Sequence, residues 1–108
     1  MVMKRESVES VVTEFIGRIR DALGERVKEI VFFGSRARGD ARKDSDYDIL
    51  LVLDNPDREL RKKVYKIVAE FNLEKDVLFS ILIRDPKIRE YERALPIGAQ
   101  IAEHGIPL

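Results

Sequence analysis

The sequence contains no cysteine and no tryptophan, and only one histidine among its 108 residues. Without cysteine the chain has no disulfide framework, no thiolate metal site and no cysteine nucleophile. His104 lies next to Gly105 near the C-terminus, where a surface or helix-capping role is expected. Neither a Ser-His-Asp set nor a zinc-protease motif is evident, so hydrolase chemistry has little support.

Excess charge and long apolar runs are also missing. Twenty basic residues balance twenty acidic ones, which argues against a nucleic-acid-coating surface. The longest apolar runs, 30–33 and 49–53, are far shorter than the roughly 18 residues of a membrane span. The N-terminal segment lacks the apolar stretch of a secretion signal. We therefore expect one cytoplasmic domain over residues 1–108, with neither nucleic acid nor membrane as a partner.

The spacing of apolar residues predicts an alternation of helices and strands. Helices are expected over 8–23, 56–71 and 85–95, and strands over 27–33, 47–53 and 77–83, with a loop at 34–46 and one short helical turn in the tail. The strand at 47–53 is almost wholly apolar, so helices should cover both faces of the sheet. These elements predict an α/β (α+β) fold with a three-stranded core sheet. Ile97, Ile101 and Ile106 in the tail either complete the core or cover an interface.

The first chemically informative segment is Gly34-Ser35, directly after a predicted strand. Glycine lets the backbone turn sharply and approach a ligand closely. If Ser35 opens a short helix, its hydroxyl and the first N–H groups favour an anion. Arg36 or Arg38 could then fork onto phosphate oxygens. No Walker A spacing follows, and Gly-Ser alone is equally typical of a plain turn.

The second informative segment is Asp46-Tyr47-Asp48, at the start of an apolar strand. Residues two apart in a strand face the same side, so the two carboxylates project together while Tyr47 points away. They repel each other unless a cation lies between them, and Mg²⁺ prefers such oxygen ligands. Taken alone, the pair is also typical of solvated loop acids.

Together the two segments predict one site. If the strands that carry them are antiparallel neighbours, the Gly-Ser turn and the aspartate pair meet at one end of the sheet. A phosphate-binding turn and a carboxylate-held Mg²⁺ would then share a pocket. That combination is typical of phosphoryl or nucleotidyl transfer, in which positioning and charge neutralisation dominate.

Gly34-Ser35, ten intervening residues and Asp46-x-Asp48, with Ala37-Arg38-Gly39 between, resemble the signature of the minimal nucleotidyltransferases. These enzymes belong to the DNA polymerase β-like nucleotidyltransferase superfamily. The resemblance implies a single minimal nucleotidyltransferase domain over 1–108 with a small mixed sheet flanked by helices. It also implies transfer of a nucleoside monophosphate, AMP from ATP, with Mg²⁺ or alternatively Mn²⁺.

Carried over by position, the resemblance assigns Gly34 and Ser35 to triphosphate binding, with Arg38 assisting. Asp46 and Asp48 become the catalytic and metal-ligating residues. The acceptor would be a hydroxyl on a protein or a small molecule. Family members often pair with a helical HEPN-domain protein, and some act as antitoxins by adenylylating it. A second copy of the chain stays open as a further partner.

One family feature is missing from the sequence. The family commonly carries a third acid within the third core strand, at the position that Ser80 occupies here. Asp76, four residues earlier, is a weaker third candidate for the metal site. The lost acid would hold the metal that activates the acceptor hydroxyl. Two hypotheses follow: a working nucleotidyltransferase, or a catalytically impaired module of that fold that acts as a protein-interaction partner.

Overall fold

The computed structural model describes residues 9–42 and 44–108. In chain order its elements are α1 (Ser10–Leu23), the short 3₁₀ helix η2 (Gly24–Arg26), β1 (Val27–Phe33), α2 (Ser35–Arg38), β2 (Tyr47–Leu53), α3 (Arg58–Lys75), β3 (Phe79–Arg84), α4 (Pro86–Glu92), α5 (Pro96–His104) and β4 (Ile106–Pro107). The four strands form one sheet in the order β3-β2-β1-β4. β2 runs antiparallel to β1 and parallel to β3, and β4 runs antiparallel to β1.

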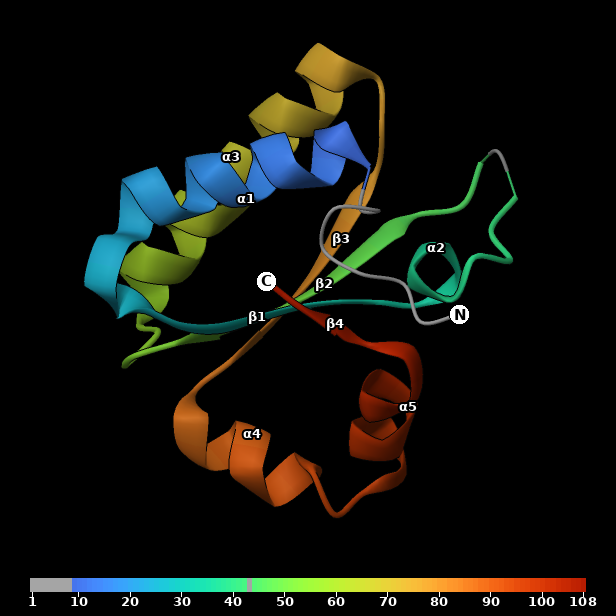
Figure 1. Ribbon diagram of the computed structural model, residues 1–108. Helices are drawn as coiled ribbons and strands as arrows, with labels where there is room; N and C mark the ends of the chain where they lie inside the picture. Colours follow the sequence, from blue (N-terminus) through green and yellow to red (C-terminus); the bar gives the residue numbers. More distant parts are fainter. Residues whose placement is uncertain (1–8, 43) are drawn as a thin grey trace.

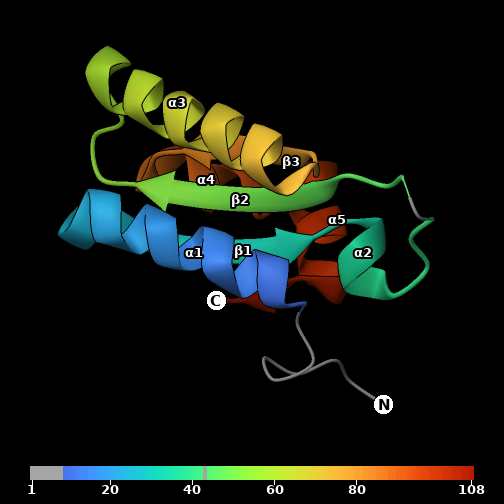
Figure 2. The same cartoon turned by 90° about the horizontal axis from the view of Figure 1, so that it is seen from above.

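Helices cover both faces of this sheet. In Figure 1, α1 and α3 lie side by side on one face, and α4 and α5 lie on the other. Figure 2 shows the same two layers from above, with β1 and β2 between them. Leu51 and Leu53 of β2 face the first layer, and Leu50 and Val52 face the second. The predicted mixed sheet between helices is therefore confirmed.

The larger core lies under α1 and α3 and is built around aromatic rings. Phe15 of α1 stacks on Phe79 of β3 with ring centroids 4.4 Å apart, and Phe79 stacks on Tyr47 of β2 at 4.8 Å. Phe71 of α3 meets Phe79 edge to face at 5.4 Å. Such pairs add to the free energy gained by burying the rings. The start of β2, which carries the predicted metal ligands, is thereby fixed to both helices.

An ion pair anchors α4 to the opposite face. Arg89 of α4 is only 6% exposed. Its Nε and Nη2 atoms each lie 3.2 Å from a carboxylate oxygen of Glu29 on β1. Because this guanidinium is taken out of water, its counter-charge matters more than that of a surface pair.

Replacing Glu29 by glutamine should therefore destabilise the domain. We expect the free energy of unfolding to fall by about 2 kcal/mol, since the buried Arg89 loses its counter-charge while Glu29 itself was partly hydrated. Glu90→Gln is the control, because the Glu90 side chain is 79% exposed and forms an exposed pair with Arg93. That variant should lose less than about 0.5 kcal/mol. Urea unfolding measures both, and equal losses would contradict the anchoring role.

The third helix begins and ends later than the predicted 56–71. Asp57 caps it by accepting a hydrogen bond from the Leu60 N–H at 2.9 Å, and the helix continues to Lys75. Asn55 lies in the preceding turn with a φ of 47°. Asp76 ends the helix in a left-handed conformation, so β3 begins at Phe79 and not at 77.

The tail differs most from the expectation of one short helical turn. It forms the nine-residue helix α5 and then β4, which adds a fourth strand to the predicted three. Gly98 allows α5 to cross α4 closely, because a Cβ there would lie 2.1 Å from the Glu92 carbonyl oxygen. Ile101 is buried with Ile97 packed against its cluster, and Ile106 is buried in the larger core. The three isoleucines therefore complete the core.

No helix in the stretches 9–42 and 44–108 is both long enough and apolar enough to cross a membrane.

Candidate active site

The Gly-Ser turn and the aspartate pair meet at one end of the sheet. In the antiparallel register of β1 and β2, Phe33 lies opposite Asp48. Gly34 follows Phe33 directly, and Asp46 precedes β2 by one residue. The expected antiparallel arrangement of these two strands is confirmed, and it brings together four of the residues assigned from the sequence: Gly34, Ser35, Asp46 and Asp48.

Gly34 lies against the carboxylate of Asp48. Its φ of 82° and ψ of −168° belong to a region that residues other than glycine rarely adopt. A Cβ built on Gly34 would lie 2.1 Å from Asp48 Oδ2 and 3.0 Å from its Cγ. Glycine is thus required here by conformation and by space. The close contact joins the turn and the aspartate into one unit.

The aspartate pair concentrates negative charge at this end of the sheet. Asp48 is half-buried, and this burial raises its pKa above the usual range of an aspartate. The neighbouring charge of Asp46 raises the pKa of Asp48 further, while Arg38 acts in the opposite direction. Among the described residues no ion pair forms to either carboxylate. A hard divalent cation bound by both would relieve this repulsion, so the donor set fits Mg²⁺ or Mn²⁺.

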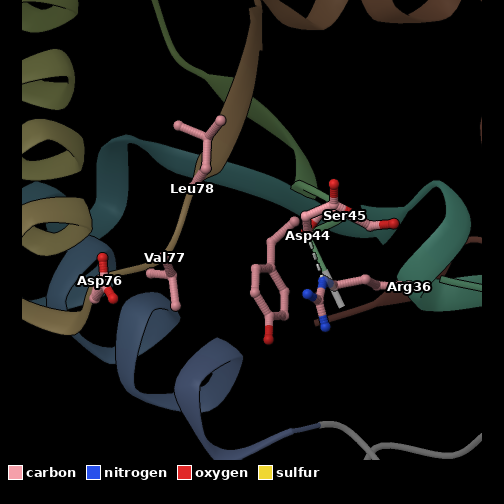
Figure 3. Close-up of a pocket in the computed structure, with 7 residues that line it drawn as sticks. Arg36, Asp44, Ser45, Asp76, Val77 and Leu78 are labelled. Atoms are coloured by element: carbon pink, nitrogen blue, oxygen red, sulfur yellow. Dashed lines mark hydrogen bonds between the residues drawn. The ribbon is translucent and has the colours of Figure 1, made fainter. Parts of the chain in front are cut away.

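The two arginines of α2 have separate positions, which the sequence left open. Arg36 extends to the α1 face of the sheet, where its guanidinium carbon lies 4.1 Å from the centre of the Tyr47 ring. Its Nε donates to the Ser45 carbonyl at 2.8 Å, the dashed line in Figure 3. Glu9 forms an ion pair with Arg36 and accepts a hydrogen bond from the Tyr47 hydroxyl at 2.8 Å. Arg36 therefore fixes the segment that leads into Asp46.

Arg38 points elsewhere and is exposed. Its Nε lies 3.4 Å from an oxygen of Asp40, and its side chain lines a cavity together with Gly34. This leaves Arg38 as the α2 arginine that can reach a phosphate bound at the turn. Sequence reasoning missed the role of Arg36, because a cation–π contact between residues eleven apart depends on tertiary packing.

Ser80 lies beside Asp48, where the family's third acid was expected. The parallel register pairs Asp48 directly with Ser80, so both side chains project from the same face of the sheet. Ser80 is exposed and adds only a hydroxyl to this edge.

Asp76 does not fill that position. It caps α3 and lines a separate cavity of about 320 Å³ with Arg36, Tyr47 and Leu78, seen in Figure 3. Within 9–42 and 44–108, no group of three or more potential ligands among histidine, aspartate and glutamate could hold a metal ion. The described site thus offers two carboxylates, without Asp76 as a third.

Known proteins share both the sequence pattern and the fold. Residues 13–97 match the family described as the nucleotidyltransferase domain. A relative from Methanocaldococcus jannaschii, assigned as a protein adenylyltransferase, is 34% identical over 80 residues, which are 73% of this chain and 81% of the relative. The protein adenylyltransferase MntA of Thermococcus cleftensis is 46% identical over 46 residues, 43% of this chain and 44% of that protein.

Solved structures show the same architecture at lower identity. A structure assigned as a nucleotidyltransferase from Sulfolobus solfataricus superposes with a TM-score of 0.58 at 19% identity, over 91% of this chain and 76% of that one. A toxin–antitoxin structure with AMP-PNP gives 0.55 at 18% identity, over 87% and 69%. The chain therefore belongs to the nucleotidyltransferase domain family, and the enzyme class expected from its sequence is confirmed.

Proposed function

We propose that this protein transfers AMP from ATP to a hydroxyl on a protein, in a Mg²⁺-dependent reaction. The observation that carries the proposal is the contact between Gly34 and Asp48, which joins the proposed phosphate-binding turn to a pair of mutually repelling carboxylates. The relatives assigned as protein adenylyltransferases support adenylate as the group transferred and a protein as the acceptor.

In this reaction the Ser35 hydroxyl and the turn at Gly34 bind the outer phosphates, and Arg38 neutralises part of their charge. Asp46 and Asp48 would hold Mg²⁺, which would offset the charge that develops on the phosphates and the leaving pyrophosphate. The acceptor oxygen forms a bond to the α-phosphorus while the bond from that phosphorus to the β-phosphate oxygen breaks. The acceptor proton is released, and pyrophosphate leaves.

A partner protein is the proposed acceptor. Several structures with this fold come from toxin–antitoxin complexes, one of them holding AMP-PNP. We propose that the chain is the antitoxin of such a pair and that its partner is a HEPN-domain protein. The acceptor would then approach the open edge of β3, beside Ser80. A homodimer is the competing arrangement.

The second candidate is an impaired nucleotidyltransferase module that binds its partner without modifying it. Ser80 beside Asp48 favours this alternative, because a site with two carboxylates lacks a ligand for a metal that activates the acceptor. The two candidates differ in whether complex formation is accompanied by transfer.

Label transfer separates them. The protein and its co-purified partner are incubated with Mg²⁺ and ATP labelled at either the α- or the γ-phosphate. Transfer predicts a labelled partner only with the α-label, and none with the Asp46→Asn/Asp48→Asn variant. Label from the γ-position, or transfer that both substitutions leave unchanged, would contradict the proposal. A stable complex without any transfer would favour the binding module.

Ser80→Asp should increase transfer by about tenfold, because a carboxylate at this register position adds a ligand near the acceptor. The metal-free variant should be less stable than the parent by about 1 kcal/mol, since a third negative charge joins Asp46 and Asp48, and Mg²⁺ should restore the loss. Ser80→Asn is the control of equal size without charge. If the asparagine and aspartate variants transfer at the same rate, the missing carboxylate does not limit this reaction.

A further inference from the structure

A cavity of about 500 Å³ lies between α5 and the end of β1. Its wall includes Gly34 and Arg38, two of the residues assigned to phosphate binding, and continues along α5 to His104. Both Figure 1 and Figure 2 show α5 next to α2 at this end of the sheet. The volume falls within the roughly 300–1,000 Å³ typical of ligand sites.

This cavity, the α5 groove, shares a face of the sheet with Asp48. Phe33, which lines the groove, is the register partner of Asp48, and directly opposite residues project from the same face. Phe33 also packs with Ile97 and Ile101 of α5 in the second core cluster. A nucleotide whose α-phosphate lies at Asp48 can therefore extend its base toward α5 without crossing the sheet.

The chemistry of the groove suits a planar heterocycle. Phe33, Ile97 and Ile101 supply an apolar floor, and Ile101 is only 3% exposed. Gln100 lies on the rim and is exposed. Its amide carries one acceptor oxygen and two donor hydrogens in a single plane. Arg38, Glu103 and His104 supply the other polar side chains of the lining. An apolar floor with a few polar groups at its edge is the usual composition of a specific small-molecule site.

We propose that the α5 groove binds the base of the nucleotide and that Gln100 selects adenine. This inference rests on the proposed function. Adenine presents an amino donor next to a ring-nitrogen acceptor, which a glutamine amide matches with two hydrogen bonds. The corresponding edge of guanine presents two acceptors, so the amide oxygen of Gln100 would face another oxygen. Gln100 is thus a specificity-determining residue.

Two glycines allow α5 to pack closely in the position that this recognition needs. Gly98 allows the close crossing with α4, and a Cβ on Gly105 would lie 2.8 Å from Val31 Cγ1 and 2.2 Å from the Ile101 carbonyl oxygen. The helix is therefore packed tightly at both ends of the groove. Positions on such a rigid element define a binding geometry better than positions on a loop.

Calorimetry with ATP, GTP and inorganic tripolyphosphate, each with Mg²⁺, tests the inference. The parent should bind ATP about tenfold more tightly than GTP, the discrimination expected of one bidentate amide contact. Gln100→Leu should lose that preference by weakening ATP binding, while its affinity for tripolyphosphate stays unchanged. Ala102→Leu is the control, because it places leucine at an exposed α5 position outside the groove lining.

Two results would overturn the inference: tripolyphosphate binding as tightly as ATP, or a preference for ATP that survives Gln100→Leu. Both leave the proposed function intact, because the phosphates still bind at the turn. If neither ATP nor tripolyphosphate binds the parent protein, the proposed function itself is contradicted, and the inference falls with it.

Discussion

An Asp46→Asn/Asp48→Asn variant should fold like the parent but lose Mg²⁺-dependent ATP binding. The loss in affinity should be at least about 100-fold, because both carboxylates proposed to hold the cation are replaced by neutral amides. Calorimetric titration with ATP, with and without Mg²⁺, measures it. The parent should show a large Mg²⁺ effect, and the variant should show none.

The stability of the metal-free variant provides the control. Burial and Asp46 together raise the pKa of Asp48, so the folded state holds the Asp48 proton to a higher pH than the unfolded chain does. The contribution of Asp48 to stability is therefore largest at acid pH and is lost as the pH rises through its raised pKa. Replacing Asp48 by asparagine removes this loss of stability on ionisation. The variant should therefore unfold at an equal or higher temperature than the metal-free parent at neutral pH. Unfolding at a lower temperature, or unchanged Mg²⁺-dependent binding, would contradict the assigned roles.

Gly34→Ala should impair both stability and transfer. The new Cβ would lie 2.1 Å from Asp48 Oδ2, and alanine disfavours the backbone conformation of Gly34. We expect a loss of about 2 kcal/mol in the free energy of unfolding from the backbone conformation alone. Transfer should fall by about 100-fold, the cost of displacing a catalytic group by roughly 1 Å.

Gly39→Ala is the matched control for that substitution. Gly39 also has a positive φ, of 87°, but within 9–42 and 44–108 no atom beyond its chain neighbours lies within 4 Å of a Cβ built on it. Alanine at this position should cost about 1 kcal/mol of stability through its left-handed conformation and leave ATP binding unchanged. Equal losses of transfer in the two alanine variants would show that the contact with Asp48 has no special role.

The sequence predicted the parts of the molecule that depend on local patterns. The apolar runs of β1 and β2 identified both strands. Because Asp46 and Asp48 are two residues apart, they were expected to project from one face, and the pairing of the strands brings them beside Gly34. The position of Ser80 was also predicted, because it follows from counting along a regular strand. The register confirms that it lies next to Asp48.

Features that depend on tertiary contacts were not predictable in this way. The tail forms a helix and a fourth strand because Gly98 and Gly105 let its backbone pack closely. The spacing of apolar residues does not predict such close packing. Arg36 pairs with Tyr47 across the sheet edge, and Gln100 reaches the α5 groove only after that helix docks. The late start of β3 reflects the extension of α3 to Lys75, where Asp76 ends the helix.

Amide resonances in the presence of ATP and Mn²⁺ give the most direct test that the turn and the aspartate pair form one nucleotide site. A bound paramagnetic ion broadens nearby signals. We predict broadening of the amides of Gly34, Ser35, Asp46, Asp48 and Ser80. The basic residues of α3, Arg61, Lys62, Lys63 and Lys66, should be unaffected. Broadening centred on α3, or on the cavity beside Asp76, would contradict the site proposed for this protein.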